Sequence, residues 1–346
     1  MTDNGLREEG TDVTACKSAR AWNRFAVALP ALAALALGAC SSAGSSQGTA
    51  STNNVTTISI SVIPNSQSDY ELPLYAAQDF GLTKANGIKF NFVQSASGSA
   101  LTTGLVARAA DYTVLPVITA SEAIKQGTGI EPFATAGPES GGFFLDSKAG
   151  SGITSISQLA GKTICVSSLG SSTGLYAAYT NVSNNLHATL VSVGSAGKEA
   201  ALLSGKATAC VEAAPSSYEL AAENKVTPLV NYGTQTPIFG VWVARSGYAQ
   251  AHKAITEALL KCWYGAIKEM QAQPSLALKE FAKWNHESAT IAMQQYDADI
   301  KTSPTTGALT LAMVNQTYNV AKAAGQGSML IPAAQMATSE FASISG

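Results

Sequence analysis

The sequence predicts an α/β protein of two lobes, and three observations lead to this prediction. Apolar residues that alternate with polar ones, as in strands, are followed repeatedly by segments with the spacing of helices. This alternation occurs in two series, at residues 58–145 and 162–230, and each begins with a strand and a Ser/Gly-rich turn. The chain has 346 residues, which is enough for two or three domains. Such alternation indicates parallel βαβ units in doubly wound sheets.

In the first series we expect strands at residues 58–62, 88–93, 112–115, 132–136 and 143–145. Two helices lie between them. Pro73 begins a helix at residues 74–80, which Gly81 ends, and the turn Ser97-Gly98-Ser99 can cap a helix that extends to residue 109.

In the second series we expect strands at residues 162–167, 189–193, 207–211 and 227–230, with helices at 170–182, 195–203 and 215–223. After a strand at 240–244, the chain is mainly helical. Apolar residues from Ile255 to Met270 recur at helical spacing and form a packing face, and Pro274 begins the next helix.

Composition excludes several other classes of protein. Hydrophobic residues make up 46% of the chain, which is too many for a disordered protein. The net charge is −2, whereas proteins that bind a nucleic-acid backbone usually carry a basic surplus. Five cysteines are too few for a disulfide scaffold of this length. The chain is therefore expected to be an ordinary globular protein with no nucleic-acid partner.

The N-terminus has the pattern of a secretory signal, because basic residues precede an uncharged apolar run at 25–37. The run is too short to span a membrane. Leu37, followed by two small residues and Cys40, resembles the bacterial lipobox, which implies lipidation of Cys40 and removal of residues 1–39. A plain signal peptide or a buried helix, with Cys40 incidental, is the alternative. The small and polar residues 41–54 are expected to form a flexible tether.

Four stretches resemble one known family. They are residues 74–82 with their glycine stop, 97–112 with an Ala-Asp-Tyr ending, 159–164 with a Leu-x-Gly-Lys-x-Ile pattern, and 243–274 with Trp263 and a proline turn. Together they resemble the periplasmic solute-binding proteins of ABC importers, in the NMT1/THI5-like branch that includes nitrate, taurine, aliphatic-sulfonate and thiamine-precursor binders. Thr208 and Gln273 depart from the family pattern, which has Asp and Asn there.

The resemblance implies a two-lobed periplasmic-binding-protein fold of type II, with a mixed sheet flanked by helices in each lobe. Residues 56–147 and 240–346 would form lobe one and residues 148–239 lobe two, with crossovers near Ser147 and Ile238 as the hinge. A solute would bind between the lobes and pass to an ABC permease and its ATPase. No cofactor or metal is implied, and we expect a monomer held outside the cell membrane by the lipid on Cys40.

The candidate binding residues lie mostly where strands end and helices begin. Free backbone amides and the positive end of a helix suit an anionic or polar group there, and ligands of open α/β sheets bind beyond the carboxyl ends of strands. Simple helix capping is the alternative. The candidates are Gln67, Tyr70, Ser97, Gly98, Ser99, Gly170, Ser171, Ser172, Thr173, Tyr176 and Glu212.

The chemistry of the solute is constrained by charge. After the expected cleavage only Arg108 and Arg245 remain as arginines, so a dianion clamped by guanidinium groups is disfavoured. A monoanion held by amides, or a neutral heterocycle against tyrosine, fits better, and the resemblance implies a sulfonate-like, nitrate-like or thiamine-precursor-like solute. Glu212 in the cleft would instead favour a cationic or amine-bearing group.

Two alternatives and one pairing remain open. Residues 170–174 also match the G-x-S-x-G pattern of a nucleophile elbow, so an exported serine hydrolase using Ser172 is possible, although no motif surrounds His252 or His286. A structural lipoprotein that has lost its ligand is the other alternative. Cys165 and Cys210 fall on strands that the family places side by side, and they either pair or remain free thiols.

Overall fold

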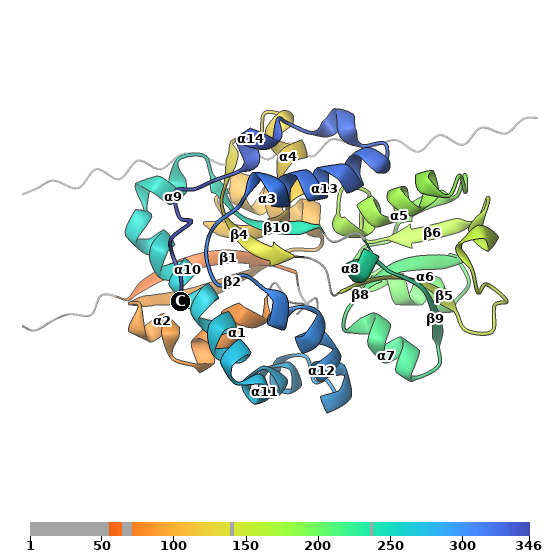
Figure 1. Cartoon of the computed structure of the whole chain (residues 1–346), viewed down its shortest axis with the longest axis horizontal. Helices are drawn as coiled ribbons and strands as arrows, with labels where there is room; N and C mark the ends of the chain where they lie inside the picture. The colour runs from red at the N-terminus through yellow and green to blue at the C-terminus, as the bar shows by residue number, and fades with distance from the viewer. Residues whose placement is uncertain (1–54, 64–70, 139–141, 236–237) are drawn as a thin grey trace, which may run out of the picture. The chain divides into compact units, whose positions relative to one another are not determined.

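The computed structural model describes residues 55–63, 71–138, 142–235 and 238–346 (Figure 1). Their strands form two five-stranded sheets, in the orders β2-β1-β3-β10-β4 and β7-β6-β8-β5-β9. The first sheet contains β1 (Thr56–Val62), β2 (Ile88–Gln94), β3 (Tyr112–Pro116), β4 (Ile130–Pro138) and β10 (Phe239–Arg245). The second contains β5 (Phe143–Lys148), β6 (Thr163–Val166), β7 (Thr189–Ser192), β8 (Ala209–Ala213) and β9 (Val226–Asn231). Each sheet with its covering helices is called a lobe below.

The helices follow the same division. Those before β5 are α1 (Leu72–Asp79), α2 (Leu82–Ala85), α3 (Gly98–Val106) and α4 (Val117–Lys125). Those between β6 and β10 are α5 (Ser172–Ser183), α6 (Lys198–Leu203), α7 (Ser216–Ala222) and α8 (Tyr232–Gln235). The C-terminal helices are α9 (Tyr248–Ala251), α10 (Lys253–Ala272), α11 (Pro274–Trp284), α12 (Ala289–Ala298), α13 (Leu311–Ala323) and α14 (Ala333–Met336). Short 3-10 turns occur at Ile156–Leu159, Ser195–Gly197, Ile300–Thr302 and Gly327–Met329.

Both sheets are mixed, which confirms the fold implied by the resemblance. β1 is parallel to β2 and β3, and β6 is parallel to β7 and β8. By contrast, β10 is antiparallel to β3 and β4, and β5 is antiparallel to β8 and β9. The parallel βαβ units predicted from the strand–helix alternation are present, and one strand in each sheet runs antiparallel to its neighbours. In each sheet the exception is the strand by which the chain arrives from the other lobe.

The predicted boundary between the lobes near Ser147 needs correction. Residues 143–148 form β5, which pairs with β8 and β9 in the second sheet, so the first crossover lies between Pro138 and Phe143. An apolar strand pattern shows that a strand forms but does not show which sheet takes it. The helix expected to reach residue 109 also ends earlier, at Val106, and Arg108 follows with a left-handed backbone (φ 60°).

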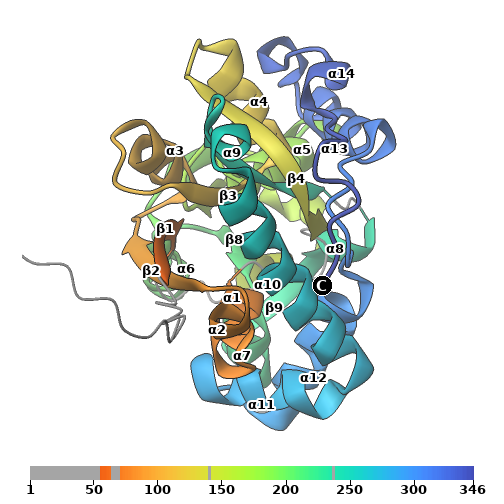
Figure 2. The same ribbon diagram turned by 90° about the vertical axis from the view of Figure 1, so that its left-hand side faces the viewer.

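Helices cover both faces of each sheet. In β10, Trp242 packs into the cluster under α1 and α10, while Val241 and Val243 pack under α3, α4 and α13. Figure 2 shows α10 running across its face of the first sheet. In the second sheet, Val211 faces the cluster beneath α5, and its neighbour Cys210 faces the cluster beneath α6 and α7. Among the described residues no helix has both the length and the apolar character to cross a membrane.

Helix α13 is not confined to the first lobe, where residues 240–346 were expected. Val314 and Tyr318 near its start pack in a first-lobe cluster, whereas Val320 and Ala321 pack in the second-lobe cluster with α5. The Tyr318 hydroxyl also lies 2.8 Å from the Ser121 hydroxyl on α4. In Figure 1 the helix accordingly lies over both lobes.

Cys165 and Cys210 lie opposite each other on the parallel strands β6 and β8 and form a disulfide. The alternative of two free thiols is therefore not what the structure shows. Cys262 on α10 is a free, buried cysteine, in keeping with its place on the predicted packing face.

Candidate functional site

A cavity of about 250 Å³ lies between the two lobes. Its walls come from the carboxyl ends of β1, β3, β6 and β8 and from the first residues of α3, α5, α6 and α7. This is where the ligands of open α/β sheets bind, because loops and helix N-termini gather beyond the strand ends. The cavity is therefore the candidate site for a small solute.

The described part of the first-lobe wall is apolar. It consists of Ile63, Gly98, Leu101, Val114, Leu115 and Pro116. Gly98 is the first residue of α3, and a Cβ built on it would lie 3.6 Å from the Cβ of Ser171. The Ser/Gly turns of the two lobes therefore meet at this point, as expected if both helix N-termini face one cleft.

The second lobe contributes a cluster of three buried hydroxyls, from Ser167, Ser171 and Thr173. The oxygens lie 2.9–3.0 Å from one another, and Ser171 also donates to the carbonyl of Ser168 at 2.7 Å. Each hydroxyl has a single proton, so these contacts can use all three protons within the cluster. The oxygens then offer lone pairs to the cavity.

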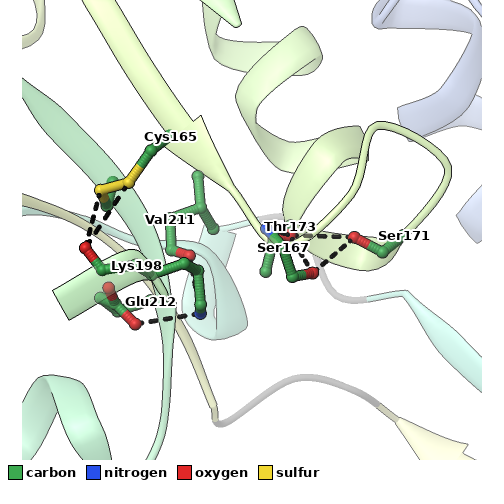
Figure 3. Close-up of polar contacts among 8 residues, drawn as sticks. Cys165, Ser167, Ser171, Thr173, Lys198, Val211 and Glu212 are labelled. Atoms are coloured by element: carbon green, nitrogen blue, oxygen red, sulfur yellow. Dashed lines mark hydrogen bonds and ion pairs between the residues drawn. A yellow bond between two sulfur atoms is a disulfide. The ribbon is translucent and has the colours of Figure 1, made fainter. Parts of the chain in front are cut away.

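Beside this cluster the cavity holds a buried ion pair (Figure 3). Lys198, the first residue of α6, places its Nζ 3.0 Å from Oε2 of Glu212, and the side chains are only 6% and 3% exposed. The same Nζ donates to the carbonyl of Val211 at 3.1 Å. Burial raises the pKa of Glu212, and the Lys198 ammonium opposes that rise. The Oε1 atom of Glu212 is buried and has no hydrogen-bond partner among the described residues.

A second acidic residue and the disulfide lie next to the ion pair. Asp146 on β5 lies opposite Cys210, is fully buried, and has Ser217 of α7 as a neighbour. Burial raises the pKa of Asp146 to about 7; the Ser217 hydroxyl and Lys198 oppose the rise, and Glu212 adds to it. The two disulfide sulfurs lie 3.8 and 3.6 Å from the carbonyl oxygen of Lys198 (Figure 3). The disulfide thus supports the backbone that carries the lysine.

The structure brings five of the sequence candidates to the cavity, namely Gly98, Ser171, Ser172, Thr173 and Glu212. Ser97 caps α3 behind Gly98, accepting from the Ala100 amide. Ser99 and Gly170 line a neighbouring hollow of about 460 Å³ instead, and the Gly170 carbonyl accepts from Thr119.

Of the three remaining candidates, one lies away from the cavity. Tyr176 is fully buried in the second-lobe core, where it stacks on Tyr232 with ring centroids 4.3 Å apart. Gln67 and Tyr70 fall outside the described residues, as does Cys40.

Sequence reasoning missed Lys198, Ser167 and Asp146. A signal for Lys198 was present, because residues 194–197 (Gly-Ser-Ala-Gly) form a third small-residue turn between a strand and a helix. No sequence signal pointed to Asp146, since its importance comes from strand pairing with β8.

A serine hydrolase would need a base beside Ser172. All three histidines belong to the described residues, and none of them lines the cavity. His252 instead stacks on Tyr248, with its Nδ1 3.0 Å from the Tyr248 carbonyl oxygen. Packing accounts for the second glycine of the G-x-S-x-G turn, because a Cβ on Gly174 would lie 2.3 Å from the carbonyl oxygen of Leu169.

Solved structures share this fold at low sequence identity. The alkanesulfonate-binding protein SsuA from Xanthomonas axonopodis pv. citri, bound to MOPS, matches with a TM-score of 0.68 and 15% identity over 81% of this chain and 96% of its own. The aliphatic sulphonate-binding SsuA from Escherichia coli matches at 0.64 and 14%, over 82% and 92%. The desulfurization enzyme DSZB matches at 0.61 and 16%, over 83% and 97%. The fold therefore serves both binding proteins and an enzyme.

No curated protein matches the chain by sequence. A family model does match, described as NMT1/THI5 like, and it covers residues 68–277, which is more than half of the chain. The match includes both lobes and every described residue of the cavity except Ile63. The chain belongs to the NMT1/THI5-like family.

Proposed function

We propose that this protein is an extracytoplasmic, lipid-anchored receptor that captures a small polar organic solute and delivers it to an ABC importer. The observation that carries the proposal is the cavity of about 250 Å³, whose walls come from both lobes. A solute there makes contacts with both lobes only when they are together, so its binding favours the closed arrangement. A permease can then distinguish the loaded receptor from the empty one.

The comparisons support this proposal at the level of family and fold. Two structural neighbours are named for binding sulfonates, which are small organic solutes of a size that suits such a cavity. The N-terminal pattern that ends at Cys40 supports secretion and lipid attachment.

Capture is tested by a thermal-shift screen of the purified mature chain. The library contains alkanesulfonates, nitrate, taurine, pyrimidines and flavins. A solute at one hundred times its Kd stabilises the folded state by about 2.7 kcal/mol, which is readily detected. If no member raises the melting temperature, the proposal of a receptor for these solutes fails.

Anchoring is tested separately by Cys40→Ser. We expect this variant in the soluble extracytoplasmic fraction and the wild type in the membrane fraction. Equal membrane attachment of both would contradict lipidation at Cys40. Binding in the screen does not depend on this result, because the mature domain is the same.

The DSZB likeness and the G-x-S-x-G turn call for an enzymatic control. We expect the wild type to hydrolyse no ester in a chromogenic panel, because no histidine lines the described cavity beside Ser172. Esterase activity that is lost in Ser172→Ala would favour the exported hydrolase instead.

A further inference from the structure

Among the described residues that line the cavity, Glu212 carries a buried side-chain acceptor without a hydrogen-bond partner, its Oε1 atom. Its partner oxygen Oε2 is paired with Lys198, but Oε1 has no hydrogen bond within the described chain, and the whole side chain is 3% exposed. A buried carboxylate oxygen without a partner is costly, and most such groups in proteins are satisfied by protein, water or ligand. Because Glu212 lines the cavity, a donor on the solute can fill this position.

The cationic groups of the site are already engaged. Lys198 is the cavity's one lysine among the described lining residues, and its Nζ is bound to Glu212 and to the Val211 carbonyl. Neither arginine of the expected mature chain lines the cavity. Arg245 is held in the first lobe by the carbonyls of Leu105 and Ala110. Two of the three Nζ protons of Lys198 are thus committed within the protein, so one N–H of this lysine is all that the described cations of the cavity leave for an anionic solute.

The remaining charge of the cavity is acidic. Glu199, the second residue of α6, lines its exposed edge, and the charges of Lys198 and Glu212 offset each other. An anion such as a sulfonate would approach the Glu199 carboxylate without a further described cation to compensate. Like charges in partly desolvated surroundings repel strongly. The charge of the described cavity therefore differs from that of a site that binds anions.

The hydroxyl cluster points to the same chemistry. The protons of Ser167, Ser171 and Thr173 can all be donated within the cluster and to Ser168, and the three hydroxyl groups then face a solute as acceptors. The apolar wall of the first lobe, including Leu101 and Leu115, suits the carbon skeleton of the same molecule.

We infer that the solute is an amino compound, bound by a nitrogen–hydrogen donor that faces Oε1 of Glu212. The donor is an ammonium group or the amino group of a small heterocycle. This inference rests on the proposed function, because it specifies the solute that the receptor captures. A charge-assisted hydrogen bond of this kind contributes roughly ten- to hundredfold in affinity.

The test compares probes that differ in one group. Taurine carries an amine where 2-hydroxyethanesulfonate carries a hydroxyl group. Cytosine carries an amino group where uracil carries an oxo group, and uracil also has a proton on the adjoining ring nitrogen. Isothermal calorimetry is carried out with each probe on the wild type, and with every hit from the library. We expect the amino member of at least one pair to bind at least tenfold more tightly than its oxygen partner.

The variant Glu212→Gln keeps the shape of the side chain and removes its charge. We expect it to weaken the bound amino probe by about ten- to hundredfold. Glu223→Gln, which removes the same charge from an exposed position at the end of α7, should bind like the wild type. Circular dichroism and the melting temperature show whether Glu212→Gln is folded, and the probe pairs on the wild type decide the question if it is not.

Each outcome decides between the proposals. If the solutes that bind all lack an N–H group, or an oxygen probe binds as well as its amino partner, the inference is wrong and the receptor proposal stands. If a folded Glu212→Gln binds the amino probe like the wild type, Glu212 is not its partner and the inference is also wrong. If no library member binds at all, the receptor proposal fails, and the inference fails with it.

Discussion

The two lobes build the cavity in different ways. The first lobe supplies apolar side chains such as Leu101 and Leu115 and the backbone at Gly98, whereas the second supplies hydroxyls and the buried pair of Lys198 and Glu212. Polar recognition is therefore concentrated on one side of the site. The other side contributes apolar surface that becomes buried when the lobes meet, which is a non-directional source of closing free energy.

The same contrast appears within the two sheets. Both are covered by helices on each face, but the face of the second sheet beneath α6 and α7 carries Asp146, Glu212 and the disulfide. Buried charges lower stability unless they are paired, so this face needs additional support. The disulfide beside the Lys198 carbonyl provides it.

The largest expected effect is on the ion pair. Lys198→Met leaves Glu212 without its partner and should destabilise the fold by about 3–5 kcal/mol at pH 8. Lys283→Met, which removes the partly exposed partner of Asp79 in the first lobe, should cost less than about 1 kcal/mol. Urea unfolding of both variants measures the difference. If both variants lose a similar free energy of unfolding, the buried pair of the second lobe contributes no more to stability than the partly exposed pair of the first lobe.

Removing the disulfide should have the next largest effect. The cysteines are 45 residues apart, so Cys165→Ala/Cys210→Ala should lower the free energy of unfolding by about 4 kcal/mol. Cys262→Ala in the first lobe should cost about 1 kcal/mol, the value of a small buried group. Calorimetric melting with and without reductant tests this. A reductant that leaves the wild-type melting temperature unchanged would contradict the prediction.

A pH dependence follows from Asp146, whose pKa burial raises to about 7. Between roughly pH 4 and 7 the folded state keeps a proton that the unfolded state has released, so this group lowers stability as pH rises across that range. The free energy of unfolding of Asp146→Asn, relative to that of the wild type, should therefore rise between pH 4 and pH 7 by at most about 4 kcal/mol. Above pH 7 the difference should stay constant. Denaturation across pH 4–8 measures the gain.

The first lobe contains a similar group, since burial also raises the pKa of Glu280 to about 7 and Asp79 adds to the rise. Glu280→Gln should gain less than Asp146→Asn, because its neighbour Lys283 is partly exposed. An equal gain in the two variants would remove the contrast between the lobes.

The smallest effect distinguishes the two turns. Gly98→Ala adds a Cβ 3.6 Å from Ser171, an ordinary contact, so the free energy of unfolding should change by less than about 0.5 kcal/mol. Gly174→Ala places a Cβ 2.3 Å from the Leu169 carbonyl oxygen and should cost about 1–3 kcal/mol. Chemical unfolding of the two alanine variants compares them directly. If the two alanine variants have equal free energies of unfolding, the second-lobe turn shifts to accommodate the added Cβ without cost.

Local patterns predicted most strands and the helices that follow them, because side-chain periodicity reports burial along one element. The same patterns assigned β5 to the wrong lobe, because Phe143–Lys148 reads as a strand whichever sheet it joins. Helix α4 was not predicted, since no polar residue caps it and Pro116 occupies the N-cap.

The site was predicted in part for a similar reason. Turns rich in Ser and Gly mark strand–helix junctions, so residues 171–173 and Gly98 were found. Lys198 was not found, because a lysine in the first turn of a helix is usually solvated. It is buried here because β8 places Glu212 beneath α6.

Helix α13 connects the two lobes, and this connection bears on solute release by the proposed receptor. Its first half is fixed in the first lobe by Val314 and Tyr318, and its second half is fixed in the other lobe by Val320 and Ala321. Separation of the two sheets removes one end of the helix from its hydrophobic cluster. This costs roughly 0.8 kcal/mol for each methylene group that becomes exposed. If the protein works as the proposed receptor, this helix resists separation of the lobes, and an importer that separates them would act against the helix as well as against the solute.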